Sequence, residues 1–160
     1  MYSEEYTYQD VEVEDVIWRP QPVGQVAFLA CPFREALFHS NRGAGKSDAL
    51  LMNYLQGVGR GWGADWRGIL FRQSFPQLAD IIVKSNKWFK QIFPEAQYNK
   101  SEHVWHFPQG EQLLLRYVND PEDYWNYHGH EFPWMGFEEL TTWPTMDCYH
   151  RLKSLCRSSR

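Results

Sequence analysis

The segment HSNRGAGKS, residues 39–47, restricts the possible folds of this chain more than any other part of it. It overlaps the end of the apolar run REALFHS, residues 34–40, which we expect to form a buried strand. It leads into KSDALLMNYLQGVG, where apolar residues recur at helical intervals until glycines end the pattern. A strand, a glycine-containing loop and a helix in this order are typical of phosphate-binding loops, in which backbone N–H groups and the helix N-terminus face the anion.

The residues of this loop supply each group that such a nucleotide site requires. Gly43 and Gly45 give the backbone its freedom. Lys46 is placed to bridge the β and γ phosphates of ATP, and the hydroxyl of Ser47 is placed to bind Mg²⁺. Ser40 replaces the first glycine of the motif, and its small side chain indicates a variant loop rather than a defective one. The predicted nucleotide-binding residues of the loop are Ser40, Asn41, Arg42, Gly43, Ala44, Gly45, Lys46 and Ser47.

Arg42 brings a permanent positive charge into the loop. Burying a guanidinium without an anion is costly, so packing does not readily explain the residue. The sequence leaves two interpretations open: Arg42 stabilises negative charge on the transferred phosphoryl group, or it points into solvent.

A second motif, FPWMGFEEL, residues 132–140, ends an apolar strand with two glutamates. Adjacent carboxylates at a strand end suit a nucleotide hydrolase, because one can hold Mg²⁺, usually through water, while the next polarises the attacking water. Glu138 is therefore predicted to bind the metal, and Glu139 to act on the water. Glu138 stands where aspartate is commoner, and a water-mediated contact tolerates its longer side chain. The alternative is that the pair marks an acidic helix start.

The remaining pattern alternates strands with helices. RGILFRQ, residues 67–73, is typical of a buried strand, and residues 76–93 carry apolar side chains at helical spacing. HVWHFPQGEQLLLRY, residues 103–117, predicts a β-hairpin around PQGE, and a last helix is expected from about Met146. The fold class predicted is α/β, with a mainly parallel sheet flanked by helices plus a β-hairpin. Ligands bind at the carboxyl ends of strands in such sheets, so the loops after Phe38 and Phe137 should meet at one edge.

Composition and charge limit the class of protein. A net charge of −4 argues against nucleic-acid binding through bulk electrostatics alone, and the basic stretch HRLKSLCRSSR is either a solvated helix end or a contact with DNA or phosphate. The three cysteines form no CxxC pair, which favours a reducing compartment. With no signal-peptide pattern and no apolar run long enough for a bilayer, we expect a soluble intracellular protein. Residues 1–24 are expected to form an N-terminal arm.

Taken together, these motifs resemble the large terminase subunit of tailed bacteriophages, the ATPase that packages DNA into procapsids. The similarity runs in the family's order through PQPVGQVAFL, REALFHSNRGAGKSDALL, GILFRQSFPQLADII, FPEAQYNKSEHVWHFPQGEQLLLRY, YHGHEFPWMGFEELTTWP and YHRLKSLCRS. The resemblance implies a P-loop NTPase fold of the ASCE type that hydrolyses ATP with Mg²⁺ to drive double-stranded DNA into the procapsid. It also implies a portal protein and a small terminase subunit as partners, a homo-oligomeric ring, and assembly in the host cytoplasm with no membrane.

The resemblance assigns roles to particular residues. Gln25 matches the family's adenine-reading glutamine, and Arg42 matches its cis-acting loop arginine, which senses or stabilises the γ-phosphate. Lys46 and Ser47 match the Walker A pair. Glu138 and Glu139 match the Walker B acid and the catalytic glutamate. The predicted catalytic residues are therefore Glu139, Arg42 and Lys46, and the predicted metal ligands are Ser47 and Glu138.

The family's coupling motif and its RNase H-like nuclease domain do not follow the second motif within these 160 residues. Residues 25–160 are therefore expected to form a partial P-loop ATPase domain without the nuclease. Two alternatives remain: another nucleic-acid motor ATPase of this type, such as a helicase, and a truncated fragment that binds nucleotide without hydrolysing it.

Overall fold

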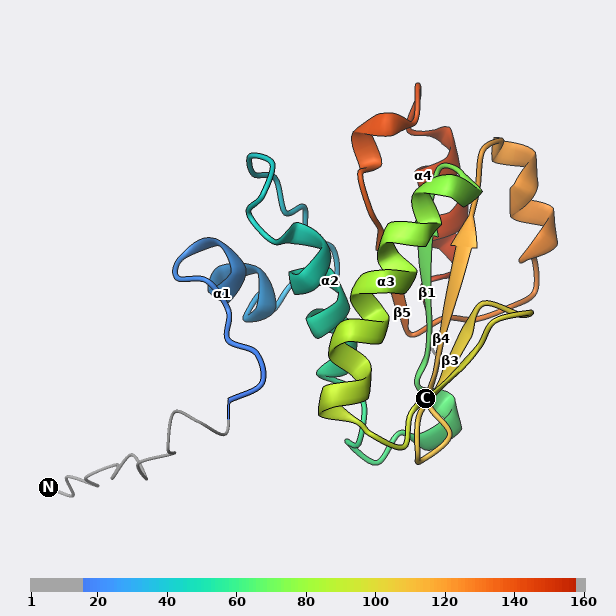
Figure 1. The fold of residues 1–160 in the computed structure, drawn as a ribbon. Coiled ribbons are helices and arrows are strands. Elements are labelled where there is room, and N and C mark those ends of the chain that lie inside the picture. The colour runs from blue at the N-terminus through green and yellow to red at the C-terminus, as the bar shows by residue number, and fades with distance from the viewer. Residues whose placement is uncertain (1–15, 158–160) are drawn as a thin grey trace, which may run out of the picture.

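The structure, a computed structural model, describes residues 16–157. Its helices are α1 (Gly24–Leu29), α2 (Lys46–Leu55), α3 (Phe75–Ile92) and α4 (Asp147–Leu152), with short 3-10 turns at η2 (Gly63–Asp65), η3 (Pro121–Asn126), η4 (Leu140–Thr142) and η5 (Lys153–Leu155). Its strands are β1 (Arg67–Arg72), β2 (Gln97–Asn99), β3 (Val104–His106), β4 (Gln112–Tyr117) and β5 (Trp134–Phe137) (Figure 1). The predicted arm, residues 1–24, lies mostly outside the described residues, and α1 begins at its last residue.

The five strands form one open sheet in the order β2-β3-β4-β1-β5. β1 pairs in parallel with β4 on one side and with β5 on the other, whereas β2, β3 and β4 pair antiparallel. The predicted α/β class and the hairpin are confirmed. The expectation of a mainly parallel sheet is wrong, because the sheet is mixed. The short PQGE turn forces β3 to run antiparallel to β4, and β2, which the sequence pattern did not indicate, extends that half.

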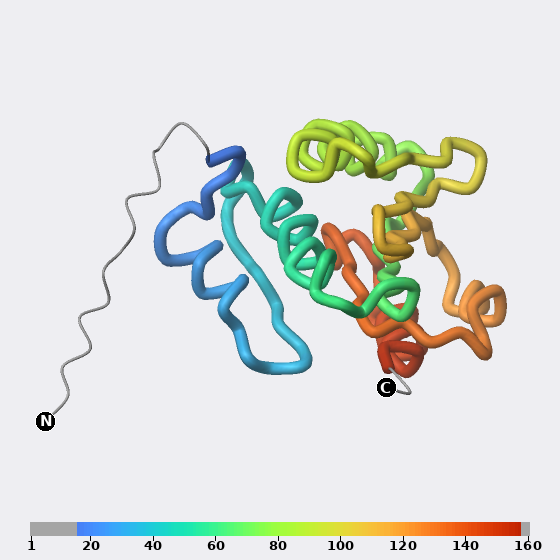
Figure 2. The backbone as a smooth tube through the Cα atoms, turned by 90° about the horizontal axis from the view of Figure 1, so that it is seen from below, coloured from blue at the N-terminus to red at the C-terminus, as the bar shows by residue number. Residues whose placement is uncertain are grey.

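Helices cover both faces of the sheet, as Figures 1 and 2 show from two directions. Successive residues of β1 point to opposite faces. Leu70 packs into a core shared with α2 and α3, and Ile69 and Phe71 pack into a second core with Trp143 and Leu152. Because both faces are buried, the β1 sequence reads as a continuous apolar run.

Helix α3 is held to the sheet by a buried polar contact as well as by apolar packing. Its fully buried face includes Ile81, Ser85 and Phe89. The indole N–H of Trp105, on β3, donates to Ser85 Oγ at 3.0 Å, and Ser85 Oγ donates to the carbonyl of Ile82 at 3.0 Å. Among the described helices, none is both long and apolar enough to cross a membrane.

The strand expected at residues 34–40 is absent, which corrects the prediction from REALFHS. These residues have no regular secondary structure, and Leu37 is 78% exposed. In Figure 2 this segment runs beside α1 rather than into the sheet. The ring of Phe38 stacks on Phe28 of α1, with ring centroids 5.2 Å apart. An apolar run of only three residues between charged or polar neighbours finds its contact on α1, and β5 remains at the edge of the sheet.

Candidate active site

The loop before α2 has the backbone conformation that its glycines permit. Gly43 and Gly45 have φ angles of 82° and 65°, in the left-handed region that other residues rarely adopt. Gly45 directly precedes α2, and its carbonyl accepts the first helical hydrogen bond from Ala49 N at 2.9 Å. A Cβ atom at Gly45 would also lie only 2.4 Å from Gln25 Nε2. Glycine at position 45 is therefore required both by the backbone angle and by the close approach of Gln25.

Lys46 reaches back across the loop that precedes it. Its ammonium group donates to the backbone carbonyls of Ser40 at 2.9 Å and Asn41 at 3.1 Å. These bonds close the loop on itself and keep a positive charge inside the turn. The position suits a group that meets phosphate oxygens.

Gln25 supports the same loop from behind. The residue is only 3% exposed, and its Nε2 donates to the carbonyls of Ala44 at 3.0 Å and Gly45 at 3.1 Å. Its Oε1 accepts a hydrogen bond from Gln21 N at 2.7 Å. Both ends of the amide are thus used within the protein, in a loop-supporting role that the sequence did not indicate. The adenine-reading role implied by the resemblance stays a prediction.

The part of the loop before Gly43, with Ser40 and Arg42, makes fewer side-chain contacts. Arg42 is exposed and forms no hydrogen bond or ion pair with residues 16–157, so both interpretations of this residue stay open. Ser40 Oγ is buried and has no hydrogen-bond partner within that range. Ser40 and Asn41 contribute their carbonyls to Lys46 instead.

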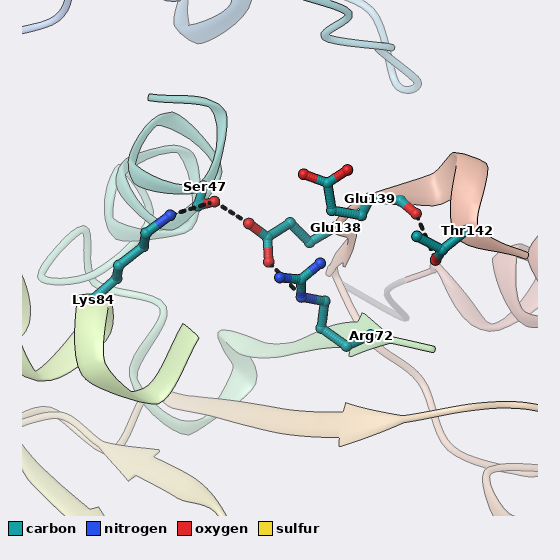
Figure 3. A network of polar contacts seen from close by, with 6 residues as sticks. All are labelled: Ser47, Arg72, Lys84, Glu138, Glu139 and Thr142. Atoms are coloured by element: carbon teal, nitrogen blue, oxygen red, sulfur yellow. Dashed lines mark hydrogen bonds and ion pairs between the residues drawn. The ribbon is translucent and has the colours of Figure 1, made fainter. Parts of the chain in front are cut away.

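Ser47 and Glu138, which are 91 residues apart in the sequence, meet in the structure. The Ser47 hydroxyl, in the first turn of α2, donates to Glu138 Oε1 directly after β5 (Figure 3). The backbone N–H of Glu138 donates to Phe71 O of β1 at 3.0 Å. The two sequence motifs therefore converge at the carboxyl ends of β1 and β5, where open α/β sheets bind ligands.

Two cationic side chains surround this contact. Arg72, at the end of β1, places Nε 2.8 Å from Glu138 Oε2, although the two atoms are not aligned as a hydrogen bond. Lys84, on α3, donates from Nζ to Ser47 Oγ at 2.8 Å. Arg72 therefore forms a buried structural ion pair with Glu138.

Glu138 is a strongly buried carboxylate, with 5% of its surface exposed. Burial raises the pKa of the Glu138 carboxyl above its ordinary value, and the Ser47 hydrogen bond and the charge of Arg72 oppose that rise. Arg72 already pairs with Glu138 Oε2, and a divalent cation would be held on the Oε1 side, beside Ser47. Mg²⁺ prefers oxygen ligands and keeps several waters, so the adjacent hydroxyl and carboxylate fit it. The described part of the chain holds no cluster of three or more His, Cys, Asp or Glu side chains suited to a metal.

Glu139 takes a different orientation from its neighbour. It is exposed, and Figure 3 draws no hydrogen bond or ion pair from its carboxylate to Ser47, Glu138 or Arg72. Its backbone has φ 53° and ψ 49°, and its carbonyl accepts from Thr142 N at 2.9 Å and Thr142 Oγ1 at 2.8 Å. Left-handed backbone in a residue other than glycine is uncommon and is concentrated at functional sites.

Lys84 is the residue of this site that the sequence reasoning missed. Residues 76–93 were interpreted only through their apolar stripe, and a lysine beside that stripe is common in any amphipathic helix. The position of Lys84 follows from Trp88, which lies four residues further along and therefore on the same helix face. Trp88 Nε1 donates to Asp48 Oδ1 at 3.0 Å, so this face of α3 lies against the first turn of α2.

The fold and the site together describe an open α/β sheet with a glycine-containing loop and helix facing a buried acid at a strand end. No family model matches the chain. No curated protein matches it, and no solved structure does.

Proposed function

We propose that this chain is the ATP-hydrolysing part of a bacteriophage DNA-packaging terminase, with a P-loop NTPase fold of the ASCE type. The observation that carries the proposal is the contact between Ser47 and Glu138, because it joins the two motifs that the resemblance pairs as Walker A and Walker B. The left-handed glycines of the loop and the inward position of Lys46 add support.

Each side chain of the site has a separate role in the proposed hydrolysis of ATP. Lys46 leaves the carbonyls of its own loop to contact the terminal phosphates of ATP. Ser47 and Glu138 would hold Mg²⁺, and the bound ion would supply positive charge that neutralises the phosphates. Glu139 orients the attacking water and accepts its proton on the carboxylate. Arg42, which is free to turn toward the loop, stabilises charge on the transferred phosphoryl group.

The same proposal covers the partners. The substrate of the motor is double-stranded DNA, and the chain works with a portal protein and a small terminase subunit in the host cytoplasm. A homo-oligomeric ring would allow neighbouring copies to complete each site. These assignments rest on the family resemblance.

Two substitutions test hydrolysis separately from binding. Glu139→Gln should lower ATP turnover by about 10²–10⁴-fold while Mg·ATP still binds, because it removes a general base and leaves the phosphate contacts in place. Lys46→Ala should weaken nucleotide binding itself. Glu95→Gln, at an exposed acid, is the matched control for Glu139. Unchanged turnover in Glu139→Gln or Lys46→Ala would refute the assignment.

A second candidate function is nucleotide binding without hydrolysis. Glu139 and Arg42 favour it, because both side chains are exposed and, within residues 16–157, no hydrogen bond or ion pair holds either of them in a position to act on ATP. Tight Mg·ATP binding with no turnover, even after addition of DNA ends and portal protein, would support this candidate. Stimulation by single-stranded DNA together with strand separation would instead indicate a helicase-type motor.

A further inference from the structure

Lys84 contacts the one hydroxyl that the proposed metal site needs. The residue is half-buried on α3, and its Nζ lies 2.8 Å from Ser47 Oγ. Within residues 16–157, no carboxylate lies within ion-pair distance of Lys84. Figure 3 shows Lys84 reaching Ser47 from the opposite side to Glu138. Its hydrogen bond is therefore made to the ligand oxygen rather than to the acid.

The hydrogen bonds of Ser47 define what Lys84 does there. A hydroxyl has one proton and two lone pairs. The proton goes to Glu138, and Lys84 occupies a lone pair. One lone pair remains for a Mg²⁺ ion, but an ion bound to the same oxygen requires strict geometry and repels an ammonium group that is hydrogen-bonded there.

We propose that Lys84 is a resident cation of this site: it holds Ser47 in the nucleotide-free protein and releases it when Mg²⁺ binds. The proposal rests on the proposed function. Lys84 suits this exchange because its charge sits on a flexible four-carbon stem. Arg72 does not, because its guanidinium is buried at the end of β1 beside Glu138. Displacing Lys84 makes metal binding harder, so the residue sets the Mg²⁺ concentration at which nucleotide binds.

The exchange is confined to the Lys84 side chain. One turn further along α3, Trp88 donates to Asp48 Oδ1, and this bond does not involve the metal ligands. Helix α3 therefore keeps its place against α2 after Lys84 leaves Ser47.

The experiment measures thermal unfolding of the full chain with ADP at increasing Mg²⁺, and also without either. Lys84→Met should unfold at a lower temperature than the wild type without ligand, because the cation near buried Glu138 is lost. With ADP, it should need about tenfold less Mg²⁺ for half-maximal stabilisation, because a competing charge is gone. Lys84→Arg keeps a cation and should retain the high Mg²⁺ requirement. Lys100→Met, at an exposed lysine directly after β2, is the matched control and should behave as the wild type.

An unchanged Mg²⁺ requirement in Lys84→Met would overturn the proposal. A higher requirement would also overturn it, because it would assign Lys84 to the nucleotide. If Lys84→Met does not fold, Lys84→Gln replaces it and the same outcomes apply. If Mg·ADP does not raise the unfolding temperature of the wild type, the proposed function itself is refuted. If Mg·ADP stabilises the wild type and Lys84→Met shows the same Mg²⁺ requirement, only the proposal for Lys84 is refuted.

Discussion

Replacement of Ser85 by alanine tests the polar contact that anchors α3 to the sheet. Both Ser85 and Trp105 are fully buried, and Ser85 Oγ is the acceptor for the Trp105 indole N–H at 3.0 Å. Without the hydroxyl, the fully buried indole N–H loses the acceptor that it has in the wild type. A buried donor left in this way costs about 1–3 kcal/mol. Alanine's better helix propensity returns less than about 0.7 kcal/mol.

The expected net loss is therefore about 1–2 kcal/mol in the free energy of unfolding. For a chain of 160 residues this corresponds to a fall of roughly 2–8 °C in the midpoint of thermal unfolding. Urea unfolding followed by far-ultraviolet circular dichroism measures the free energy directly. The slope of the urea dependence should not change, because the unfolded surface is the same.

Ser154 provides a closely matched control. Its hydroxyl also donates to the carbonyl three residues earlier, Arg151 O at 2.7 Å, but the residue is exposed and accepts no indole bond. Ser154→Ala should therefore stay within about 0.5 kcal/mol of the wild type. In a Trp105→Phe background, Ser85→Ala should cause little further loss in the free energy of unfolding, because no indole N–H remains that needs an acceptor. Equal stability of Ser85→Ala and Ser154→Ala, or additive losses in the double variant, would refute the reasoning.

Three further predictions concern the site. Gly45→Ala should weaken ADP binding more than Gly43→Ala. Both positions have positive φ, but only a Cβ at Gly45 meets another side chain. The rise in unfolding temperature that ADP causes, measured for each variant, compares the two. Arg72→Met should lower the free energy of unfolding by about 3 kcal/mol at neutral pH, because it leaves the buried Glu138 carboxylate without its ion-pair partner. Adding Glu138→Gln should restore much of that loss, and urea unfolding measures both variants. The pKa of Glu138 is raised in the folded protein, so its contribution to stability is greatest below the ordinary value of 4.5 and is lost as the pH rises through the folded value. Relative to Glu138→Gln, the wild type should therefore lose stability from pH 4.5 upward, and parallel pH profiles would contradict this.

Elements with strong periodicity were predictable from sequence. Helix α3 repeats its apolar residues at helical spacing over its whole length, and the hairpin of β3 and β4 is set by a short turn between two β-rich runs. The meeting of Ser47 and Glu138 was predicted as well, from the rule that ligands gather at the carboxyl ends of strands. Glu138 does follow the strand β5, whereas the strand expected before the loop of Ser47 is absent, so the rule accounts for only one of the two residues.

Other features depend on contacts between distant residues, and local patterns do not encode these. The segment around Leu37 has the composition of a short strand, yet Phe38 packs on Phe28 of α1 and Leu37 stays exposed. Lys84 is indistinguishable from any surface lysine until α3 is placed against α2. Gln25 likewise finds its role only once the loop carbonyls are in position.

The position of the loop therefore follows from how α2 packs, since residues 16–45, the described part of the chain before α2, contain no strand. Helix α2 is attached to β5 near both of its ends. At one end Ser47 bonds Glu138, and at the other Trp134 Nε1 donates to Asn53 Oδ1 at 2.8 Å.

Tyr54 reinforces the second attachment. Its ring meets Trp134 edge-on with centroids 5.3 Å apart. It lies against β1 at Gly68, where a Cβ would come within 2.6 Å of the ring. The absence of a side chain at Gly68 thus lets Tyr54 approach the sheet, and Tyr54 with Trp134 sets the distance between helix and strand. The contact between the two motifs is a consequence of this aromatic packing at the far end of α2, so a substitution at Gly68 would disturb the site without touching any residue of either motif.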